Sequence, residues 1–195
     1  MTFEPTQLTG VWLIHLEPRQ DERGLFVRTA CTREFAAHGL NTHWPQANLT
    51  RTLHTGTVRG LHWQAEPQPE IKLVRCSHGA IWDVVVDLRP DSPTCGQWQA
   101  FELSADAFQQ LYVPAGFAHG FQALTPGAEV SYLMSEFYVP ELARGCRWND
   151  PYLRIAWPLP AHSLSPRDQS LPTLRELGIP IKSRSPGANP AGFGV

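Results

Sequence analysis

A regular alternation of side chains in the middle of the chain constrains its fold more than any other feature. Between residues 80 and 88 the chain alternates two sets of side chains, one being Ala80, Trp82, Val84, Val86 and Leu88 and the other Ile81, Asp83, Val85 and Asp87. Successive side chains of a β-strand point to opposite faces, so a period of two predicts a strand. Similar short runs predict further strands over residues 10–16, 25–29, 58–63, 72–76, 98–103, 110–113, 120–124 and 130–138.

Turn signals separate many of these runs, as in His78-Gly79 and Pro126-Gly127. The chain contains 18 prolines and 15 glycines, which favours short strands over long helices. Short helices are predicted only over residues 32–38 and 171–177. So many strands in 195 residues predict an all-β sandwich or jelly roll, in a single domain over residues 1–182. Residues 183–195 are rich in Gly, Pro and Ser and are expected to form a loose C-terminal tail, or an arm packed on a partner.

Charge and hydropathy argue against several classes of protein. The net charge is −2, and no basic run marks a surface for nucleic acid. No apolar stretch approaches the ~20 residues that a membrane span needs, and the first ten residues do not resemble a signal peptide. The four cysteines are widely scattered, which indicates free thiols in a reducing compartment. The sequence therefore predicts a soluble cytoplasmic protein that binds neither nucleic acid nor membrane.

Two motifs carry the candidate chemistry. Residues 56–64 place His62 six positions after a glycine, and residues 114–121 contain a P-x-G-x-x-H motif that ends at His119. Together they resemble the two signature strands of the cupin jelly roll. Metal-binding cupins carry H-x-H on the first strand, but the second position here is Gln64, a poor metal ligand. His62, His119 and Glu66 would form a depleted ligand set, so no metal is expected.

A longer succession of motifs makes the resemblance more specific. The chain is similar to the dTDP-4-dehydrorhamnose 3,5-epimerase family over roughly residues 5–180. This resemblance implies a cupin-type double-stranded β-helix with a few short peripheral helices, and a homodimer that exchanges N-terminal strands. It also implies an isomerase that needs no cofactor and acts on a nucleotide sugar. The segments that carry it are Asp21–Phe26, Gln46–Asn48, Arg59–Gln64, Lys72–Val74, Asp83–Arg89, Pro114–Phe121, Tyr132, Tyr138–Pro140, Trp148–Pro151 and Ser165–Asp168.

The residue types suit proton transfer beside a ketone, which needs a base, a donor at the ketone oxygen and an acid on the opposite face. The resemblance makes His62 the base and Asp168 the carboxylate that orients it and stabilises the imidazolium. Lys72 is one of only two lysines among 16 basic residues, which hints at a compact ammonium at the enolate oxygen. Tyr132 would protonate the opposite face. The expected reaction inverts C3, C5 or both in a nucleoside-diphosphate 4-keto-6-deoxyhexose, of the kind that yields dTDP-4-dehydrorhamnose.

Candidate binding residues follow from the same resemblance. Arg59 and His119 would contact the diphosphate, since a guanidinium offers a fork of donors. The remaining candidates are Gln46 and Asn48 at the nucleotide or sugar, Arg23 and Phe26 reaching the nucleotide from the neighbouring subunit, and Tyr138 stacked on the base.

The nucleotide-binding set departs from the family pattern at three positions. Arg28 and Ala143 stand where glutamates are usual, and Arg167 replaces a lysine. If Arg28 touches the base, it favours cytosine, which presents acceptors, over thymine, which presents an N3–H donor. The alternative is that Arg28 pairs with a phosphate or a surface carboxylate.

Simpler structural explanations exist for each catalytic candidate. His62 could be a structural strand residue, Asp168 a helix N-cap, Tyr132 a core residue and Lys72 a solvated strand residue. Asp83 and Asp87 could be paired catalytic carboxylates, but strand alternation with arginine side chains as their partners explains them better. Three other functions also remain open: a single-centre epimerase acting on another nucleotide sugar such as a CDP-linked deoxysugar, a non-catalytic sugar-binding cupin, and a metal-dependent cupin oxygenase.

Overall fold

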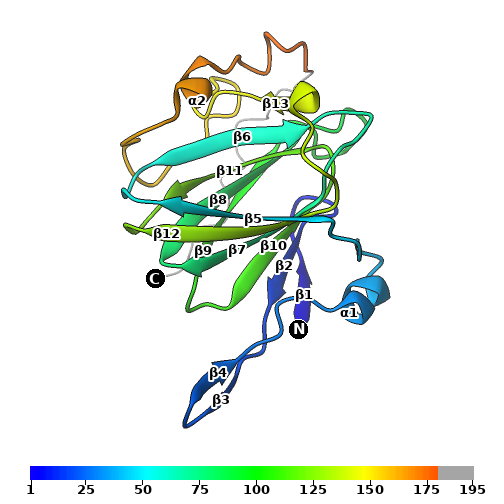
Figure 1. Cartoon of the computed structure of the whole chain (residues 1–195). Coiled ribbons are helices and arrows are strands. Elements are labelled where there is room, and N and C mark those ends of the chain that lie inside the picture. The colour runs from blue at the N-terminus through cyan, green and yellow to red at the C-terminus, as the bar shows by residue number, and fades with distance from the viewer. Residues whose placement is uncertain (180–195) are drawn as a thin grey trace.

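Two antiparallel sheets pack face to face in the protein, whose structure is a computed structural model that describes residues 1–179 (Figure 1). One sheet contains six strands in the order β1 (Thr2–Pro5), β2 (Trp12–His15), β10 (Gln109–Val113), β7 (Lys72–His78), β12 (Ala128–Met134) and β5 (Gln46–Thr52). The other contains five, in the order β13 (Ala143–Gly145), β6 (Val58–Gln64), β11 (Phe117–Ala123), β8 (Ala80–Asp87) and β9 (Trp98–Ser104).

The chain crosses repeatedly between the two sheets. Strand β7 of the first sheet leads directly into β8 of the second, and β11 of the second is followed by β12 of the first. Neighbours within each sheet are therefore mostly distant in the sequence, which is the connectivity of a jelly roll. The predicted all-β, cupin-type double-stranded β-helix is confirmed.

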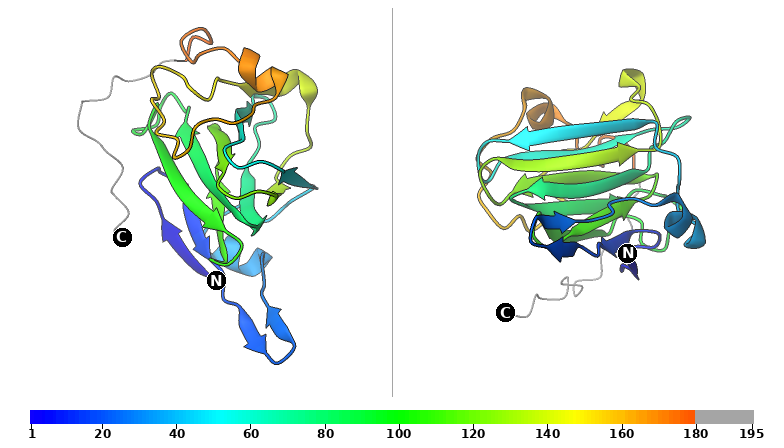
Figure 2. Two further views of the ribbon diagram at one scale, coloured as in Figure 1. Left: turned by 90° about the vertical axis from the view of Figure 1, so that its left-hand side faces the viewer. Right: turned by 60° about the horizontal axis from the view of Figure 1, so that its bottom comes forward.

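A two-stranded hairpin projects from this body. Its strands are β3 (Arg19–Asp21) and β4 (Gly24–Phe26), and the left view of Figure 2 shows it extending beyond the sheets. Strand β4 is shorter than the predicted strand over residues 25–29. At its end, the Phe26 side chain is 71% exposed, an unusual position for a large aromatic residue.

Strand β8 confirms the alternation from which its prediction came. Ile81 and Val85 lie in the core between the sheets, whereas Val84 and Val86 face outward. The outward face is itself covered by later parts of the chain, including Leu153. Both faces of β8 are therefore buried, which explains its nearly continuous apolar sequence.

Two buried carboxylates on β8 have different partners. Asp87 pairs with Arg89 at 2.7 Å, as the sequence predicts. Asp83 instead pairs with His119 at 2.8 Å, so the prediction of an arginine partner was wrong at this position. The strand pairing explains the difference, since β11 lies beside β8 and carries His119 on the neighbouring strand.

The helices were predicted with mixed success. Helix α1 (Thr32–Ala37) confirms the prediction over residues 32–38. The helix predicted over residues 171–177 was wrong, and the helix of this region is α2 (Pro166–Ser170), with a single 3-10 turn η1 (Pro140–Leu142) elsewhere. Residues 171–179 make one i→i−4 bond, from the Leu177 N–H to the Thr173 carbonyl oxygen at 3.1 Å, before Gly178 at φ +68° ends the turn.

The remaining sequence predictions concern the C-terminus and the membrane. The tail predicted over residues 183–195 lies outside the described residues. Among residues 1–179, no helix is long and apolar enough to cross a membrane.

Candidate active site

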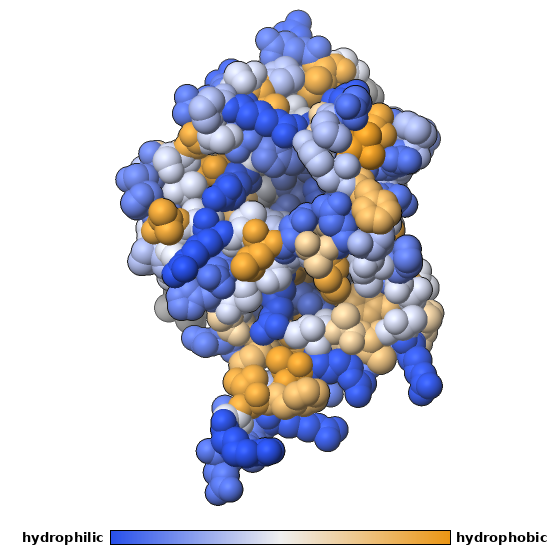
Figure 3. Space-filling model, in the orientation of Figure 1, coloured by the Kyte–Doolittle hydropathy of each residue, from blue (hydrophilic) through white to orange (hydrophobic). Residues whose placement is uncertain are grey.

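A cavity of about 820 Å³ opens between strands of the two sheets. Strands β5, β6, β7, β11 and β12 contribute to its wall, together with residues 163–168 around the start of α2. Figure 3 shows the molecule hollowed on this face, among mostly polar residues. The structure brings together all four predicted catalytic side chains at this cavity: His62, Lys72, Tyr132 and Asp168.

His62 and Asp168 form a close pair. The His62 Nε2 atom lies 2.6 Å from the Asp168 carboxylate, although 106 residues separate them in the sequence. The carboxylate is almost fully buried, whereas the imidazole is 37% exposed. Because Nε2 faces the carboxylate, Nδ1 is the ring nitrogen available to a substrate proton.

Helix α2 places the Asp168 carboxylate. The Ser165 hydroxyl accepts the Asp168 N–H at 3.0 Å and caps the helix, so Ser165 is the N-cap and the Asp168 side chain is left for His62. Burial alone would raise the pKa of Asp168, but hydrogen bonds from His62, the Gly60 N–H and Ser165 outweigh it and hold that pKa below its usual value. Asp168 is therefore ionised at neutral pH.

Close contact between β6 and β11 brings two histidines to the same wall. His62 and His119 are direct partners across these strands. Gly60 has a φ of +126°, and a Cβ built there would lie 2.6 Å from the Cα of Gly120. Only glycine allows this approach, so the glycines of both motifs set the distance between the strands that carry the histidines.

His119 belongs to a second histidine–aspartate pair. Its Nε2 atom lies 2.8 Å from the carboxylate of Asp83, and both side chains are buried. The ring of Tyr132 meets the His119 ring edge-on, with centroids 6.0 Å apart.

Tyr132 has a core contact and a place in the cavity wall. Its ring packs against the core between the sheets, while the residue also lines the cavity. Burial raises the pKa of its phenol well above the usual value, so the hydroxyl keeps its proton at neutral pH. A protonated phenol is what a general acid requires.

Lys72 is buried rather than solvated. Its ammonium lies 2.6 Å from the carboxylate of Glu70 and donates to the His62 carbonyl oxygen at 3.4 Å. The alternative of a solvated strand residue was wrong. Glu70, which precedes β7 by two residues, was missed.

The predicted binding residues fall into two groups. Arg59, Asn48, His119 and Arg167 line the main cavity. Tyr138 lines an adjoining cavity of about 120 Å³, which shares His62 and Arg167 with the main one.

Gln46 and Gln64 support these cavities through hydrogen bonds. Gln46 donates to the Asn48 side chain at 3.2 Å and accepts the Tyr138 N–H at 3.0 Å. The Gln64 amide donates to the carbonyl oxygens of Gln68 and Phe137 and accepts the N–H of Val139 at 2.9 Å. In the part of the chain that the structure describes, no group of three or more His, Cys, Asp and Glu side chains is arranged to hold a metal ion.

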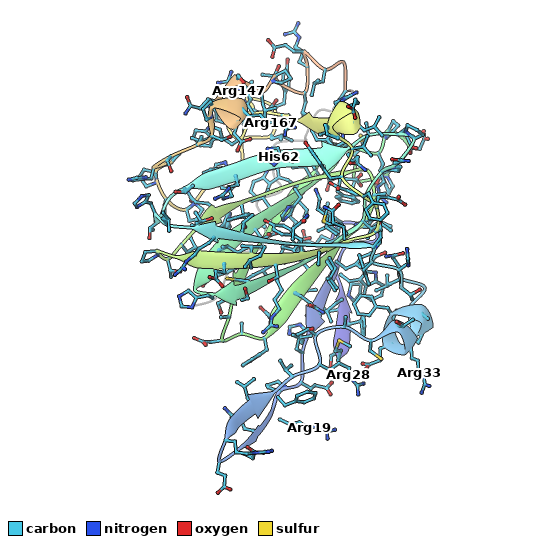
Figure 4. The ribbon with its side chains drawn as sticks, in the orientation of Figure 1. Arg19, Arg28, Arg33, His62, Arg147 and Arg167 are labelled. Carbon is cyan, nitrogen blue, oxygen red and sulfur yellow. The ribbon has the colours of Figure 1, made fainter. Side chains whose placement is uncertain are left out.

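The other predicted binding residues lie far from the cavity of their own chain. Arg23 and Phe26 are on the projecting hairpin, where Arg23 pairs with Asp21 at 2.6 Å. Arg28 pairs with Glu34 at 3.0 Å. Figure 4 shows His62 and Arg167 near one end of the molecule and Arg28 near the other.

Comparison with known proteins agrees with this geometry. A family model described as dTDP-4-dehydrorhamnose 3,5-epimerase matches residues 5–176. The chain belongs to this family. It is 41% identical over 180 residues to the dTDP-4-dehydrorhamnose 3,5-epimerase of Sinorhizobium fredii, with 92% of each chain covered. It is also 40% identical over 177 residues to a dTDP-4-dehydrorhamnose 3-epimerase of Streptomyces niveus, covering 90% of this chain and 85% of the relative.

A solved member of the family has the same fold. The crystal structure of the Bacillus anthracis dTDP-4-dehydrorhamnose 3,5-epimerase, with TDP and PPi bound, matches with a TM-score of 0.86 and 40% identity. The match covers 89% of this chain and 99% of that one. The predicted family and the predicted epimerase, an isomerase, are confirmed, while the roles of individual residues stay predictions.

Proposed function

We propose that this epimerase inverts C3, C5 or both in a dTDP-linked 4-keto-6-deoxyhexose, through an enolate and without a metal or organic cofactor. The observation that carries the proposal is the convergence of the His62–Asp168 pair, Lys72 and Tyr132 on one cavity. The names of the relatives supply the nucleotide and the sugar.

The first half of the reaction breaks a C–H bond next to the ketone. Nδ1 of His62 takes the proton. The electron pair of the C–H bond forms a double bond to C4, and the π electrons of the C4 carbonyl group move to its oxygen. Asp168 stabilises the imidazolium by accepting its Nε2–H. The Lys72 ammonium donates to the developing oxyanion, whose charge grows in the transition state and is greatest in the enolate.

The second half forms a new C–H bond on the opposite face of the sugar. Tyr132 delivers its phenolic proton to the carbon as the enolate returns to the ketone. The resulting tyrosinate and imidazolium then regain the starting protonation states by exchange with water. Because the proton that leaves and the proton that arrives differ, each inversion introduces a solvent hydrogen.

The nucleotide would occupy the cavity beside these groups. Arg59 and His119 face the diphosphate in this proposal, with Asn48 and Arg167 on the same wall. Tyr138, 53% exposed beside the smaller cavity, offers a ring on which the base can stack.

Solvent deuterium incorporation tests the proposal. In D₂O, with NMR observation, we expect deuterium at C3, C5 or both of a dTDP-linked 4-keto-6-deoxyhexose. Incorporation at C3 alone would favour a single-centre enzyme, for which the Streptomyces niveus 3-epimerase gives a precedent. If only a CDP-linked substrate reacts, the substrate is a CDP-linked sugar and not a dTDP-linked one. If the sugar binds but no deuterium enters it, the protein is a non-catalytic sugar-binding cupin. The cytoplasmic location stays a prediction.

We also propose a homodimer in which the hairpin of one protomer completes the cavity of its partner. The support is the exposure of Leu25 and Phe26 on a hairpin that projects from the body (Figure 1) and contributes no residue to the wall of its own chain's cavity. Large exposed apolar side chains of this kind mark interaction surfaces. Arg23 would enter the partner's site with Phe26.

A mixing experiment tests this arrangement. His62→Ala and Phe26→Ala are each expected to be inactive when purified alone. If hairpins are exchanged, random mixing with subunit exchange gives half heterodimers, each with one intact site, so about a quarter of wild-type activity returns. No recovery, despite heterodimers detected by mass, would show that each hairpin serves its own chain.

A further inference from the structure

A buried ion pair separates the main cavity from the smaller one. Lys72 lines the main cavity and Glu70 lines the smaller one, and their charged atoms lie 2.6 Å apart. The side chains are only 8% and 10% exposed, respectively. We propose that Glu70 is a positioning residue of the epimerase, whose carboxylate balances the charge of the buried Lys72 ammonium and aims it at the substrate oxygen. This inference rests on the proposed function.

Burial explains why the ammonium needs a partner. Lys72 is the first residue of β7, with Val113 and Met134 as its strand partners on either side. Transfer of an ammonium from water into such surroundings is unfavourable, and an unpaired lysine would tend to lose its proton. A neutral amine could no longer stabilise an oxyanion as a cation does.

The other charged and titratable groups at the cavity do not replace Glu70. Arg59, His119 and Arg167 bring no negative charge to the ammonium. Asp168 is engaged by His62. Tyr132 keeps its proton, because burial raises its pKa. Among residues 1–179, Glu70 is the carboxylate that forms an ion pair with Lys72.

The hydrogen bonds of the ammonium leave one donor for the substrate. An ammonium has three N–H groups. The ammonium is held by the ion pair with Glu70 at 2.6 Å and by one hydrogen bond to the His62 carbonyl oxygen at 3.4 Å. The third N–H is free to point into the main cavity, so both contacts together fix the direction of the donor toward the sugar.

Direct observation of the lysine tests the inference without substrate. Lys182 is the other lysine of the chain, so Lys182→Arg leaves a single lysine for ¹³C labelling. We expect the Lys72 Cε signal, observed at one neutral pH, to change position in Glu70→Gln, because the ammonium loses the ion-pair partner that lies 2.6 Å away. Glu129→Gln, which removes a carboxylate 3.6 Å from Arg51 on the surface, is the matched control and should leave the signal unchanged.

Kinetics provide the second measurement. In Glu70→Gln, kcat should fall by about tenfold or more, while KM stays near the wild-type value, because the oxyanion forms only after binding. Glu70→Asp keeps the charge but shortens the side chain by one methylene, so its kcat should lie between those of wild type and Glu70→Gln. If the glutamine variant does not fold, a wild-type kcat in Glu70→Asp would contradict the positioning role.

The two proposals fail in different ways. An unchanged lysine signal and an unchanged kcat in a folded Glu70→Gln variant would overturn the role of Glu70, whatever the reaction. Absence of deuterium exchange in wild type would overturn the proposed function while the lysine signal could still respond to Glu70.

Discussion

The pairing of His62 with Asp168 gives the sharpest prediction about catalysis. In Asp168→Asn, the Gly60 N–H, 3.5 Å from Oδ2 in wild type, favours the amide oxygen at that position. The amide NH₂ then faces Nε2 of His62, where the wild-type carboxylate oxygen lies at 2.6 Å. An NH₂ group can only donate, so Nε2 must accept and the ring proton moves to Nδ1. The nitrogen that should take the substrate proton is then already protonated.

The expected loss follows from this wrong tautomer. The variant also lacks the charge that stabilises the imidazolium, and together these effects should lower kcat by ~10³–10⁴-fold. Deuterium incorporation at saturating substrate, followed by NMR, measures the loss directly. KM should change little, because Asp168 acts through His62.

A second buried carboxylate provides the matched control. Asp87→Asn removes the ion-pair partner of Arg89 at the end of β8, away from the cavity. It should lower the stability of the fold while leaving kcat near the wild-type value. If Asp168→Asn kept its kcat within about tenfold of wild type, with a normal fold, the assignment of His62 as an Asp168-oriented base would be wrong.

Further predictions concern the acid and base, metal, the nucleotide and pH. His62→Ala should abolish exchange at every reactive carbon, whereas Tyr132→Phe should leave some exchange while impairing inversion; normal turnover by His62→Ala would contradict the mechanism. Activity should survive prolonged chelation and dialysis, because Gln64 stands where a second histidine ligand would be needed; loss that a divalent metal restores would refute this. Arg28→Glu should leave the ratio of dTDP to CDP affinity unchanged, because Arg28 already pairs with Glu34, and a changed ratio in titrations would show that Arg28 reads the base. Burial would raise the pKa of Asp87, but hydrogen bonds from Arg89 and two hydroxyls outweigh burial and lower that pKa. The Asp87 carboxylate therefore stabilises the folded protein above its unfolded-state pKa of about 3.9, and this stabilisation is lost as pH falls through its folded-state pKa. Denaturant unfolding should therefore show a smaller loss of stability on acidification in Asp87→Asn than in wild type.

Much of the fold could be predicted because its central strands alternate clearly. Strand β8 has two well-separated sets of side chains, and its neighbours carry apolar runs of similar length. Strand β5 was missed because it lies at a sheet edge, where exposed positions carry polar side chains and no alternation survives. The three-residue β13 depends on a distant partner, β6, which no local pattern reveals.

The wrong helix over residues 171–177 has a related cause. Leu171, Leu174 and Leu177 recur at helical spacing, and Leu174 is indeed buried. The backbone, however, turns only once here, because Gly178 at φ +68° ends the turn directly after the Leu177 N–H bonds to the Thr173 carbonyl oxygen. The periodicity therefore predicted the burial correctly and the backbone conformation incorrectly.

The site was predictable where residue type and motif coincided. His62 and Asp168 were expected to act together, and the structure places them 2.6 Å apart. Glu70 was overlooked because a glutamate before a strand is usually a solvated residue, and its burial depends on the surrounding tertiary structure. The hairpin residues Arg23 and Phe26 could be named from the resemblance, but a single chain leaves them away from its own cavity.

The hydrogen bonds of Gln64 have a consequence for redesign. Its amide fastens the segment that carries Tyr138, through the carbonyl of Phe137 and the N–H of Val139. An imidazole offers one donor and one acceptor and cannot replace an amide that makes three bonds there. Gln64→His, the change that would introduce the H-x-H spacing of a metal-binding cupin, would therefore break hydrogen bonds that hold the Tyr138 segment beside the smaller cavity. The three hydrogen bonds of Gln64 therefore oppose a histidine at this position.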